Sequence, residues 1–176
     1  NQLSKIQDDS DFRIATKVEE INQLTEEISI LNQKVSSVEL AGTTANDERD
    51  RRDLLVKQLG EKINIKYAES KNGQLSITAG NTAVLVSGSS HSKLSVAEEQ
   101  GKNFQIHYRS TEDSTPVNVT KQLVGGEIGG LLDVRDKTIV GLKDKLDELA
   151  FGLATEVNKA HVEGYNRYNQ KGGLFF

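Results

Sequence analysis

The chain has 176 residues and a formal net charge of −4, with 22 basic and 26 acidic residues interleaved along it. Interleaved charges make no basic field that would bind a nucleic-acid backbone or an anionic membrane, so neither is expected as a partner. Cysteine is absent, which excludes disulfides, thiolate metal sites and cysteine nucleophiles.

The sequence predicts neither a membrane span nor a cleaved signal peptide. It has no run of about 18 apolar residues, and the opening NQLSKIQDDSDF has neither a basic nor an apolar region. The chain starts at Asn1 and contains no methionine. These features favour a fragment of a longer protein.

The first predicted element is a long amphipathic helix that starts at Phe12. From Ile14 onward its apolar residues recur at alternate spacings of three and four: Ile21, Leu24, Ile28, Leu31, Val35 and Val38. Such a heptad seam buries a narrow edge against one or two partner helices. Roughly 28 residues extend about 42 Å in a helix, so an elongated molecule is expected.

A second, shorter helix is predicted between the break AGTTAND and Gly60. Opposite charges lie four residues apart in three pairs: Glu48 with Arg52, Arg49 with Asp53, and Asp53 with Lys57. We interpret this run as a solvated, self-paired face, because interleaved signs make no net field for a binding patch.

Residues 61–124 change to a two-residue period, and turn signals such as KNGQ and SGSS separate the apolar stretches. This pattern predicts a small antiparallel β-rich module. Residues 1–60 and 125–176 are then expected to form one discontinuous helical-bundle domain.

The helical period returns after GGEIGG and forms a second seam that continues to about His161. Its apolar members are Leu132, Ile139, Leu142, Leu146, Leu149, Leu153 and Ala160. Two long heptad helices on either side of a β insertion most simply pack antiparallel. The expected fold is therefore α+β, an elongated bundle of long antiparallel heptad helices with a small antiparallel β module inserted.

The glycines of GGEIGG stand where a phosphate-binding loop would open a helix. No Lys-Ser or Lys-Thr pair follows them, and the preceding strands look antiparallel. We interpret them as a re-entry from the β module to the helix, at which two backbones approach closely.

Two of the three histidines give no catalytic pattern. His91 lies in SGSSHSK with Ser89 and Ser90, but no G-x-S-x-G elbow surrounds them and no acid is placed to orient the base. A solvated turn is the preferred interpretation. His107 alternates with the apolar residues of its strand and is expected to be exposed, without a role.

The third histidine, His161, shares a helical face with Asn158, which suggests a metal or acid-base pair. The second histidine that such a site needs is absent, because Tyr165 occupies the position four residues on. We interpret His161 as binding the last carbonyls of the helix and Gly164 as the left-handed residue that ends it. Tyr165, Phe175 and Phe176 are expected to anchor the chain against the helices. No catalytic, cofactor-binding or metal-binding residue and no cofactor is predicted, and the interface residues stay open.

Three stretches together resemble the flagellar hook-associated protein 1 family: NDERDRRDLLVKQLGEKINI, GGEIGGLLDVRD and VNKAHVEGYNRYNQKGGLFF. The first matches the family motif at Asn46, Asp50, Arg52, Asp53, Leu55, Val56 and Leu59. The second matches at Gly126, Ile128, Gly129, Gly130, Leu131, Leu132 and Arg135. The third matches at Asn158, His161, Gly164, Tyr165, Phe175 and Phe176.

The resemblance implies a non-enzymatic structural role in the bacterial flagellum. Copies would form a ring between hook and filament, in contact with hook protein and with the adjacent hook-associated protein. Export through the flagellar type III channel, without signal cleavage, would place the protein outside the cell. The family's terminal heptad segments, to which subunit association and the export chaperone are assigned, are absent here, so this central fragment is expected to be monomeric.

Two alternatives come from other classes of protein. The heptad seams alone would equally suit a coiled-coil adhesin or adaptor module. A cell-wall hydrolase would need paired carboxylates, and the acids of the β module, Glu98, Glu99, Glu112 and Asp113, lie in loop-like stretches.

Overall fold

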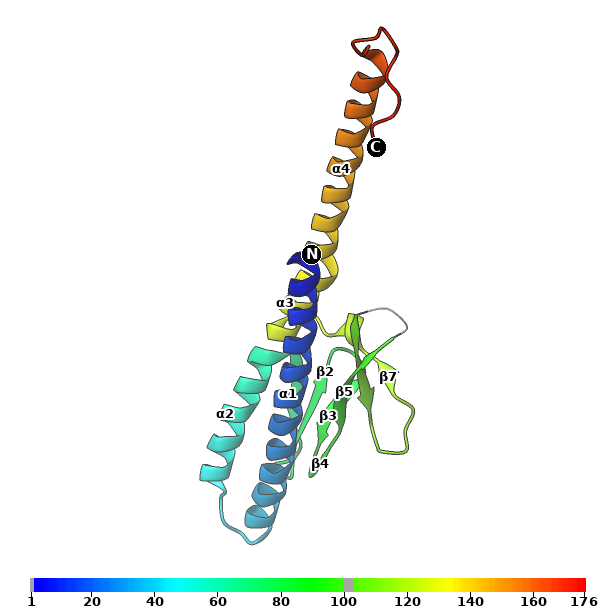
Figure 1. The fold of residues 1–176 in the computed structure, drawn as a ribbon. Helices are drawn as coiled ribbons and strands as arrows, with labels where there is room; N and C mark the ends of the chain where they lie inside the picture. Colours follow the sequence, from blue (N-terminus) through cyan, green and yellow to red (C-terminus); the bar gives the residue numbers. More distant parts are fainter. Residues whose placement is uncertain (1, 100–102) are drawn as a thin grey trace.

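The computed structural model describes residues 2–99 and 103–176 and combines long helices with two small antiparallel sheets (Figure 1). The helices are α1 (Gln2–Leu40), α2 (Asn46–Lys62), α3 (Gly126–Asp133), the π-helical η2 (Val134–Thr138) and α4 (Ile139–Glu163). The strands are β1 (Ile65–Glu69), β2 (Leu75–Ala79), β3 (Ala83–Ser87), β4 (Ser90–His91), β5 (Lys93–Glu98), β6 (Phe104–Arg109) and β7 (Val117–Asn118), followed by the 3-10 turn η1 (Thr120–Gln122). The predicted α+β class is confirmed.

Helix α1 is 39 residues long and begins at Gln2 instead of the predicted Phe12. Its first turns keep the helical spacing through Leu3, Ile6 and Ser10, although polar residues surround them. The predicted start was wrong because these few apolar residues are separated by the run QDDSD, which hides the period.

The predicted seam of α1 lies in the hydrophobic core. Its buried members are Ile14, Ile21, Ile28, Leu31 and Val35. Burial of each such side chain contributes about 1.5–3 kcal/mol relative to exposure. The helix α2 returns antiparallel to α1 (Figure 1) and buries Leu55, Val56 and Leu59 in the same core.

The strands form two antiparallel sheets, with the orders β1-β2-β3-β4 and β5-β6-β7. Alternate residues of β2 and β3 are buried, among them Leu75, Ile77 and Leu85, because a two-residue period places them on one face. Helix α1 contacts β3, β4 and β5, so one core joins the helices to both sheets. The antiparallel pairing predicted from the sequence is confirmed.

The glycine stretch before α3 permits a close backbone approach, as predicted. Gly126 has a φ of +64°, and a Cβ at this position would lie 2.7 Å from the backbone nitrogen of Ile63 and from the carbonyl oxygen of Lys62. No larger residue fits there without moving α2. The start of α3 is thereby fixed against the end of α2.

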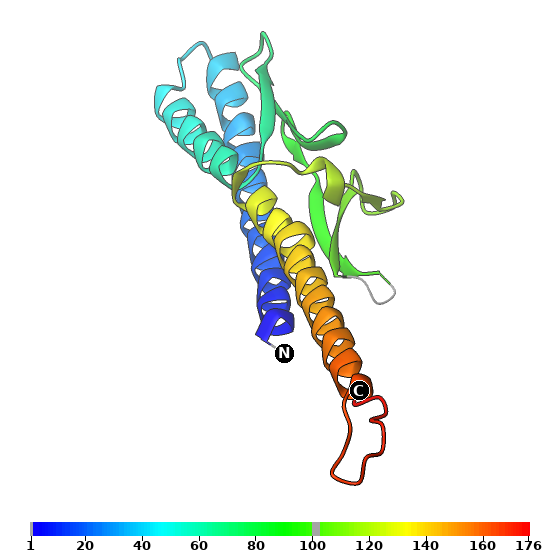
Figure 2. The same cartoon turned by 90° about the horizontal axis from the view of Figure 1, so that it is seen from above.

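The segments α3, η2 and α4 follow one another along a single path, and α4 extends past the start of α1 (Figures 1 and 2). The first part of the predicted second seam is buried at Leu132 and Ile139. Its continuation is exposed by 46% to 68% at Leu142, Leu146, Leu149 and Leu153. The prediction that this seam is packed along its whole length was wrong, because α1 does not reach those turns.

Candidate functional site

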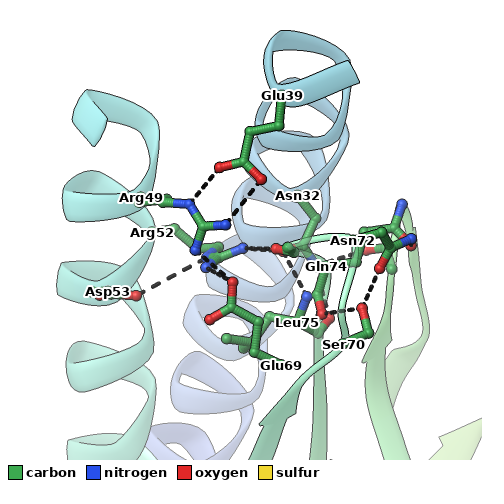
Figure 3. A network of polar contacts seen from close by, with 12 residues as sticks. Asn32, Glu39, Arg49, Arg52, Asp53, Glu69, Ser70, Asn72, Gln74 and Leu75 are labelled. Atoms are coloured by element: carbon green, nitrogen blue, oxygen red, sulfur yellow. Dashed lines mark hydrogen bonds and ion pairs between the residues drawn. The ribbon is translucent and has the colours of Figure 1, made fainter. Parts of the chain in front are cut away.

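A buried arginine of α2 joins both N-terminal helices to the first sheet (Figure 3). Arg52 is 1% exposed, and its Nη1 donates to Oδ1 of Asn32 on α1 (3.0 Å) and to the carbonyl of Gly73 (2.6 Å). Its Nη2 donates to Oε1 of Glu69 at the end of β1 (3.3 Å). Because a buried charge is costly unless it is paired, these contacts fix α2 relative to both α1 and the sheet.

Two asparagines of α1 bind strand backbone in the same way. The side-chain amide of Asn32 donates to the carbonyl of Leu75 (2.8 Å) and accepts its N–H (3.1 Å). Asn22 makes the same two bonds to Leu94 of the second sheet, each 2.9 Å long. Asn32 also donates to the carbonyl of Gly88 (2.8 Å). One helix therefore satisfies backbone groups in both sheets, as buried polar groups require.

The charges of α2 pair with other elements instead of within the helix. Arg49 binds Glu39 at the end of α1 (2.7 Å) and Glu69 of β1 (2.5 Å). Hydrogen bonds to Glu39 and then Glu69 raise the pKa of Arg49, and the hydrogen bond from Arg49 lowers the pKa of Glu39. The predicted self-paired face was wrong, because Arg49 and Arg52 pair with Glu39 and Glu69 of other elements. Within α2, Oδ1 of Asp53 lies 4.0 Å from Nε of Arg52. Arg49 and Arg52 both converge on Glu69 (Figure 3).

A second fully buried arginine lies in the π-helical segment η2. The Nη1 atom of Arg135 donates to Oδ1 of Asp11 on α1 (2.6 Å) and to the carbonyl of Phe104 on β6 (2.7 Å). Asp136 accepts from its Nε (2.7 Å) and Nη2 (2.9 Å). Burial acts to lower the pKa of Arg135, but the hydrogen bonds to Asp136 and Asp11 raise it above its ordinary value. The base of α4 is thus fixed to α1 and to the second sheet.

The structure corrects the interpretation of His91, which lies in β4 against α1 and not in a solvated turn. Its Nδ1 is 3.3 Å from the hydroxyl oxygen of Ser29. Ser29 is buried, and its hydroxyl donates to the carbonyl of Glu26 (2.7 Å). A buried hydroxyl engaged with its own helix cannot reach a substrate, so this pair is a contact between helix and strand.

His107 is also more buried than predicted, with a side chain 14% exposed. Its Nε2 lies 3.2 Å from Oε1 of Glu99, and Asn118 donates to the same oxygen (3.2 Å). These three residues connect β6 and β7 to the end of β5. The expectation of an exposed strand histidine was wrong because β7 pairs with β6 at this position, which places Asn118 beside His107.

The carboxylates that a hydrolase would need lie at opposite ends of the second sheet. In the β5–β6 register Lys93 faces Arg109 and Glu98 faces Phe104. Glu98 therefore lies at one end of the pair, whereas Glu112 follows the other end. The five residue steps from Lys93 to Glu98 extend about 17 Å along the strand, whereas paired glycosidase carboxylates lie roughly 5–9.5 Å apart.

Within residues 2–99 and 103–176, no group of three or more histidine, aspartate or glutamate side chains is arranged to hold a metal ion. None of the described helices is long and apolar enough to cross a membrane.

The end of the chain folds back on α4 through two side chains, and we name Asn158, His161 and residues 172–176 the terminal clasp. Oδ1 of Asn158 accepts the N–H groups of Phe175 (2.6 Å) and Phe176 (3.0 Å). Nδ1 of His161 lies 2.7 Å from the carbonyl oxygen of Gly173, and its ring is 5.6 Å from that of Phe175. Asn158 and His161 thus bind backbone of the returning chain.

The helix end differs from the prediction in two respects. Gly164 has φ −78° and ψ 162°, which is extended and not left-handed. Its N–H donates to the carbonyls of Ala160 (3.1 Å) and His161 (3.3 Å), so backbone satisfies these carbonyls and the imidazole is left for Gly173. The prediction that Tyr165 and both terminal phenylalanines anchor the chain was too broad, because all three are exposed and Phe175 alone has a ring contact with α4.

The sequence motifs pointed to Arg52, Arg135, Asn158 and His161 without indicating what they contact. The partners on α1, Asn22, Asn32 and Asp11, were missed. A signal for two of them was present, because Asn22 and Asn32 each follow a seam residue directly. An amide at the border of a buried helix face needs a partner.

Helices joined to two small antiparallel sheets by buried arginine and asparagine side chains define a structural domain of the α+β class. The family model of the flagellar hook-associated protein FlgK helical domain matches residues 1–176. The chain belongs to this family of flagellar hook-associated proteins.

Relatives named flagellar hook-associated protein 1 occur in several bacteria. The chain is 27% identical over 167 residues to that of Salmonella typhimurium, with 93% of this chain and 30% of the relative covered. It is 27% identical over 168 residues to that of Escherichia coli, with the same coverage. The match to the Bacillus subtilis protein has 23% identity over 197 residues and covers 99% of this chain and 39% of the relative. The chain thus spans about a third of each relative.

A solved structure has the same fold. The flagellar hook junction protein FlgK from Burkholderia pseudomallei superposes with a TM-score of 0.84 at 24% identity. The match covers 98% of this chain and 32% of that one.

Proposed function

We propose that this chain is a structural part of the bacterial flagellum at the junction of hook and filament, and that it acts by packing between subunits without catalysis. The observation that carries this proposal is the family match over residues 1–176. The buried networks of Arg52 and Arg135 support it, because they hold three helices and two sheets in one fixed arrangement. A subunit that transmits force between two assemblies needs such rigidity.

The overall shape and organisation are part of the proposal. An elongated bundle with residues 1–60 and 125–176 as its helical part, and residues 61–124 as a β-rich module, would present long lateral faces to neighbouring subunits. The exposed turns of α4 support an elongated shape, and we expect the isolated chain to be monomeric. Small-angle scattering of residues 1–176 should give an extended particle; a compact, nearly spherical profile would contradict this.

The proposed partners are those that the resemblance to the family implies. In its full-length form the protein would contact further copies of itself in a ring, the hook protein and the adjacent hook-associated protein. An export chaperone would bind segments outside residues 1–176. Export through the flagellar type III channel without signal cleavage would place the protein in the extracellular part of the flagellum.

The proposal is tested in cells that carry the full-length gene. Deletion of the gene should leave hooks without attached filaments and abolish swimming, and the wild-type gene should restore both. A gene encoding Arg135→Ala should restore less, whereas Arg51→Ala should restore fully because the Arg51 side chain is 70% exposed. Filaments attached at normal number in the deletion strain, counted by electron microscopy, would overturn the proposal.

A further inference from the structure

The hairpin turn between β1 and β2 contains Asn72 followed directly by Gly73, a pair of residues that can react with each other. The backbone nitrogen of the glycine can attack the side-chain amide of the asparagine, because glycine has no side chain to obstruct the approach. Asparagine is one of the thermally labile residues. Asn72 is exposed, and no other asparagine in the sequence precedes a glycine.

The reaction at Asn72 would have a defined course. The Gly73 nitrogen bonds to Cγ of Asn72, and its proton leaves with Nδ2 as ammonia, which closes a five-membered succinimide ring. Water then adds to one of the two ring carbonyls. Opening at Cγ gives aspartate with the normal main chain, whereas opening at the backbone carbonyl gives isoaspartate, in which the main chain runs through Cβ and Cγ. Water is the only co-reactant.

The folded turn blocks the first step of this reaction (Figure 3). Gly73 is buried with a φ of +74°, and its N–H donates to the carbonyl of Ser70 (3.0 Å). In the ring, Cγ would take the place of this hydrogen, where the Ser70 oxygen already lies. Nδ2 of Asn72 also donates to Oε1 of Gln74 (3.2 Å), and Oδ1 of Asn72 contacts the Ser70 hydroxyl. The ring can therefore close only when the turn opens.

The same turn carries a backbone carbonyl that binds Arg52. The Gly73 oxygen accepts from Nη1 of this buried arginine (2.6 Å), and a Cβ on Gly73 would lie 2.7 Å from Nη2 of Arg49 and from Oε2 of Glu39. Isoaspartate at position 72 adds one carbon to the main chain directly before Gly73, which has no space to shift toward these side chains. The buried charge would lose an acceptor, which is destabilising. Aspartate leaves the main chain unchanged.

We propose that Asn72 is a site of spontaneous deamidation that the folded turn protects, so that the modification accumulates in chains that have been unfolded. The inference rests on the contacts of residues 70–74 and is independent of the proposed function. The isoaspartate form refolds to a less stable protein, because Arg52 loses the Gly73 carbonyl. A period of unfolding is thereby recorded as a lasting chemical change.

Peptide mass spectrometry of the full-length protein at neutral pH tests this inference. In guanidinium chloride Asn72 should be deamidated at least about tenfold faster than in the native protein, because reaction of the native protein requires local opening. Asn81, an exposed asparagine in the next turn, is the internal control. It should react far more slowly in guanidinium chloride than Asn72, because the β-branched Thr82 follows it. Equal rates at Asn72 in the two states, or at Asn72 and Asn81 in the unfolded chain, would overturn the proposal.

A variant of the turn tests the protection directly. Ser70→Ala removes the hydroxyl that contacts the Asn72 amide and donates to the carbonyl of Gln74 (2.8 Å). It should raise the native rate several-fold and leave the rate in guanidinium chloride unchanged. An unchanged native rate would contradict the protective role of the turn.

The consequence for stability is tested on protein that was deamidated while unfolded and then refolded. Its isoaspartate fraction should unfold at a lower guanidinium chloride concentration than Asn72→Asp, which carries the same charge on a normal main chain. Equal midpoints would contradict the loss of the Arg52 contact.

Discussion

Helices α1 and α4 carry similar heptad patterns and have opposite surroundings. The seam of α1 is buried by α2 and both sheets, whereas the seam of α4 is buried only up to Ile139. A heptad pattern therefore predicts that a helix face is covered but does not indicate which element covers it. Substitutions in the two helices should show that the free energy of unfolding depends strongly on α1 and weakly on the exposed turns of α4.

The largest effect is expected at the junction of the two helices. Arg135→Ala removes the hydrogen bonds that Nη1 of Arg135 donates to Asp11 and to the carbonyl of Phe104. Breaking a buried charge pair from one side costs about 3–5 kcal/mol. Urea unfolding should show a loss of this size, against less than about 1 kcal/mol for the exposed pair removed by Arg51→Ala. Equal losses for the two variants would mean that Arg135 does not hold α4 to α1.

The seams themselves give the next largest contrast. Ile21→Ala in α1 should cost about 2–5 kcal/mol, since Ile21 is fully buried and the substitution leaves a cavity. Leu149→Ala in residues 1–176 should change the free energy of unfolding by no more than about 0.5 kcal/mol, because the side chain is already solvated. A large cost at Leu149 in this chain would show that its seam is covered in solution by another copy.

A smaller effect is expected from the amide that joins α1 to the first sheet. Asn32→Ala leaves Nη1 of Arg52, the N–H of Leu75 and the carbonyl of Gly88 without this partner. An unsatisfied buried polar group costs about 1–3 kcal/mol, and denaturant unfolding should report a loss in this range. Gln33→Ala, at the exposed neighbouring position, is the control and should be nearly neutral.

The fold was predictable where local pattern decides it. The period of the side chains gave the change from helix to strand and back, and the crowded site of Gly126 followed from a cluster of glycines. The partners of the charged residues were not predictable, because they depend on distant elements. Arg135 and Asp11 are 124 residues apart, and Arg52 and Asn32 are 20 apart. On α2, the spacing of four residues predicted ion pairs within the helix. In the structure Arg49 and Arg52 instead bind carboxylates of other elements, Glu39 and Glu69.

The exposure of the later part of the second predicted seam, Leu142 to Leu153, was unpredictable for a related reason. Leu132 and Leu149 belong to the same sequence pattern, yet one is buried and the other exposed. Leu132 is buried and Leu149 is exposed because α4 extends past the first residue of α1. The start of α1 was predicted wrongly because its first turns are mostly polar. The contacts of Asn158 and His161 were also not predictable. Both side chains bind backbone groups of residues 173–176, and a backbone group cannot be recognised as a partner from the sequence.

Acid should weaken the contacts of α1 in a defined direction. Hydrogen bonds from Lys62 and then Lys17 lower the pKa of Glu20 below its ordinary value of 4.5, and Arg49 lowers that of Glu39. A carboxylate with a lowered folded-state pKa contributes stability above its unfolded pKa, and this contribution is lost as pH falls through the folded value. Unfolding midpoints should therefore be steady from pH 7 to 5 and fall below pH 4.5. Glu20→Gln should flatten that fall, and an unchanged profile would exclude Glu20 as its source.

The smallest effect is expected at the terminal clasp. As at Asn32, an asparagine side chain accepts backbone N–H groups there, but the surroundings are less buried. Asn158 binds the backbone N–H groups of Phe175 and Phe176 as Asn32 binds that of Leu75, but Asn158 is only partly buried whereas Asn32 is fully buried. Water can replace the lost bonds in Asn158→Ala, so the free energy of unfolding should change by less than about 0.5 kcal/mol, and His161→Gln should behave alike. Hydrogen exchange should report the local change: the amides of Phe175 and Phe176 should exchange faster in Asn158→Ala. Lys159→Ala is the control and should leave their exchange rates unchanged. A loss at Asn158 as large as that at Asn32 would show that the clasp is buried in solution, and that the free end of α4 is covered there as well.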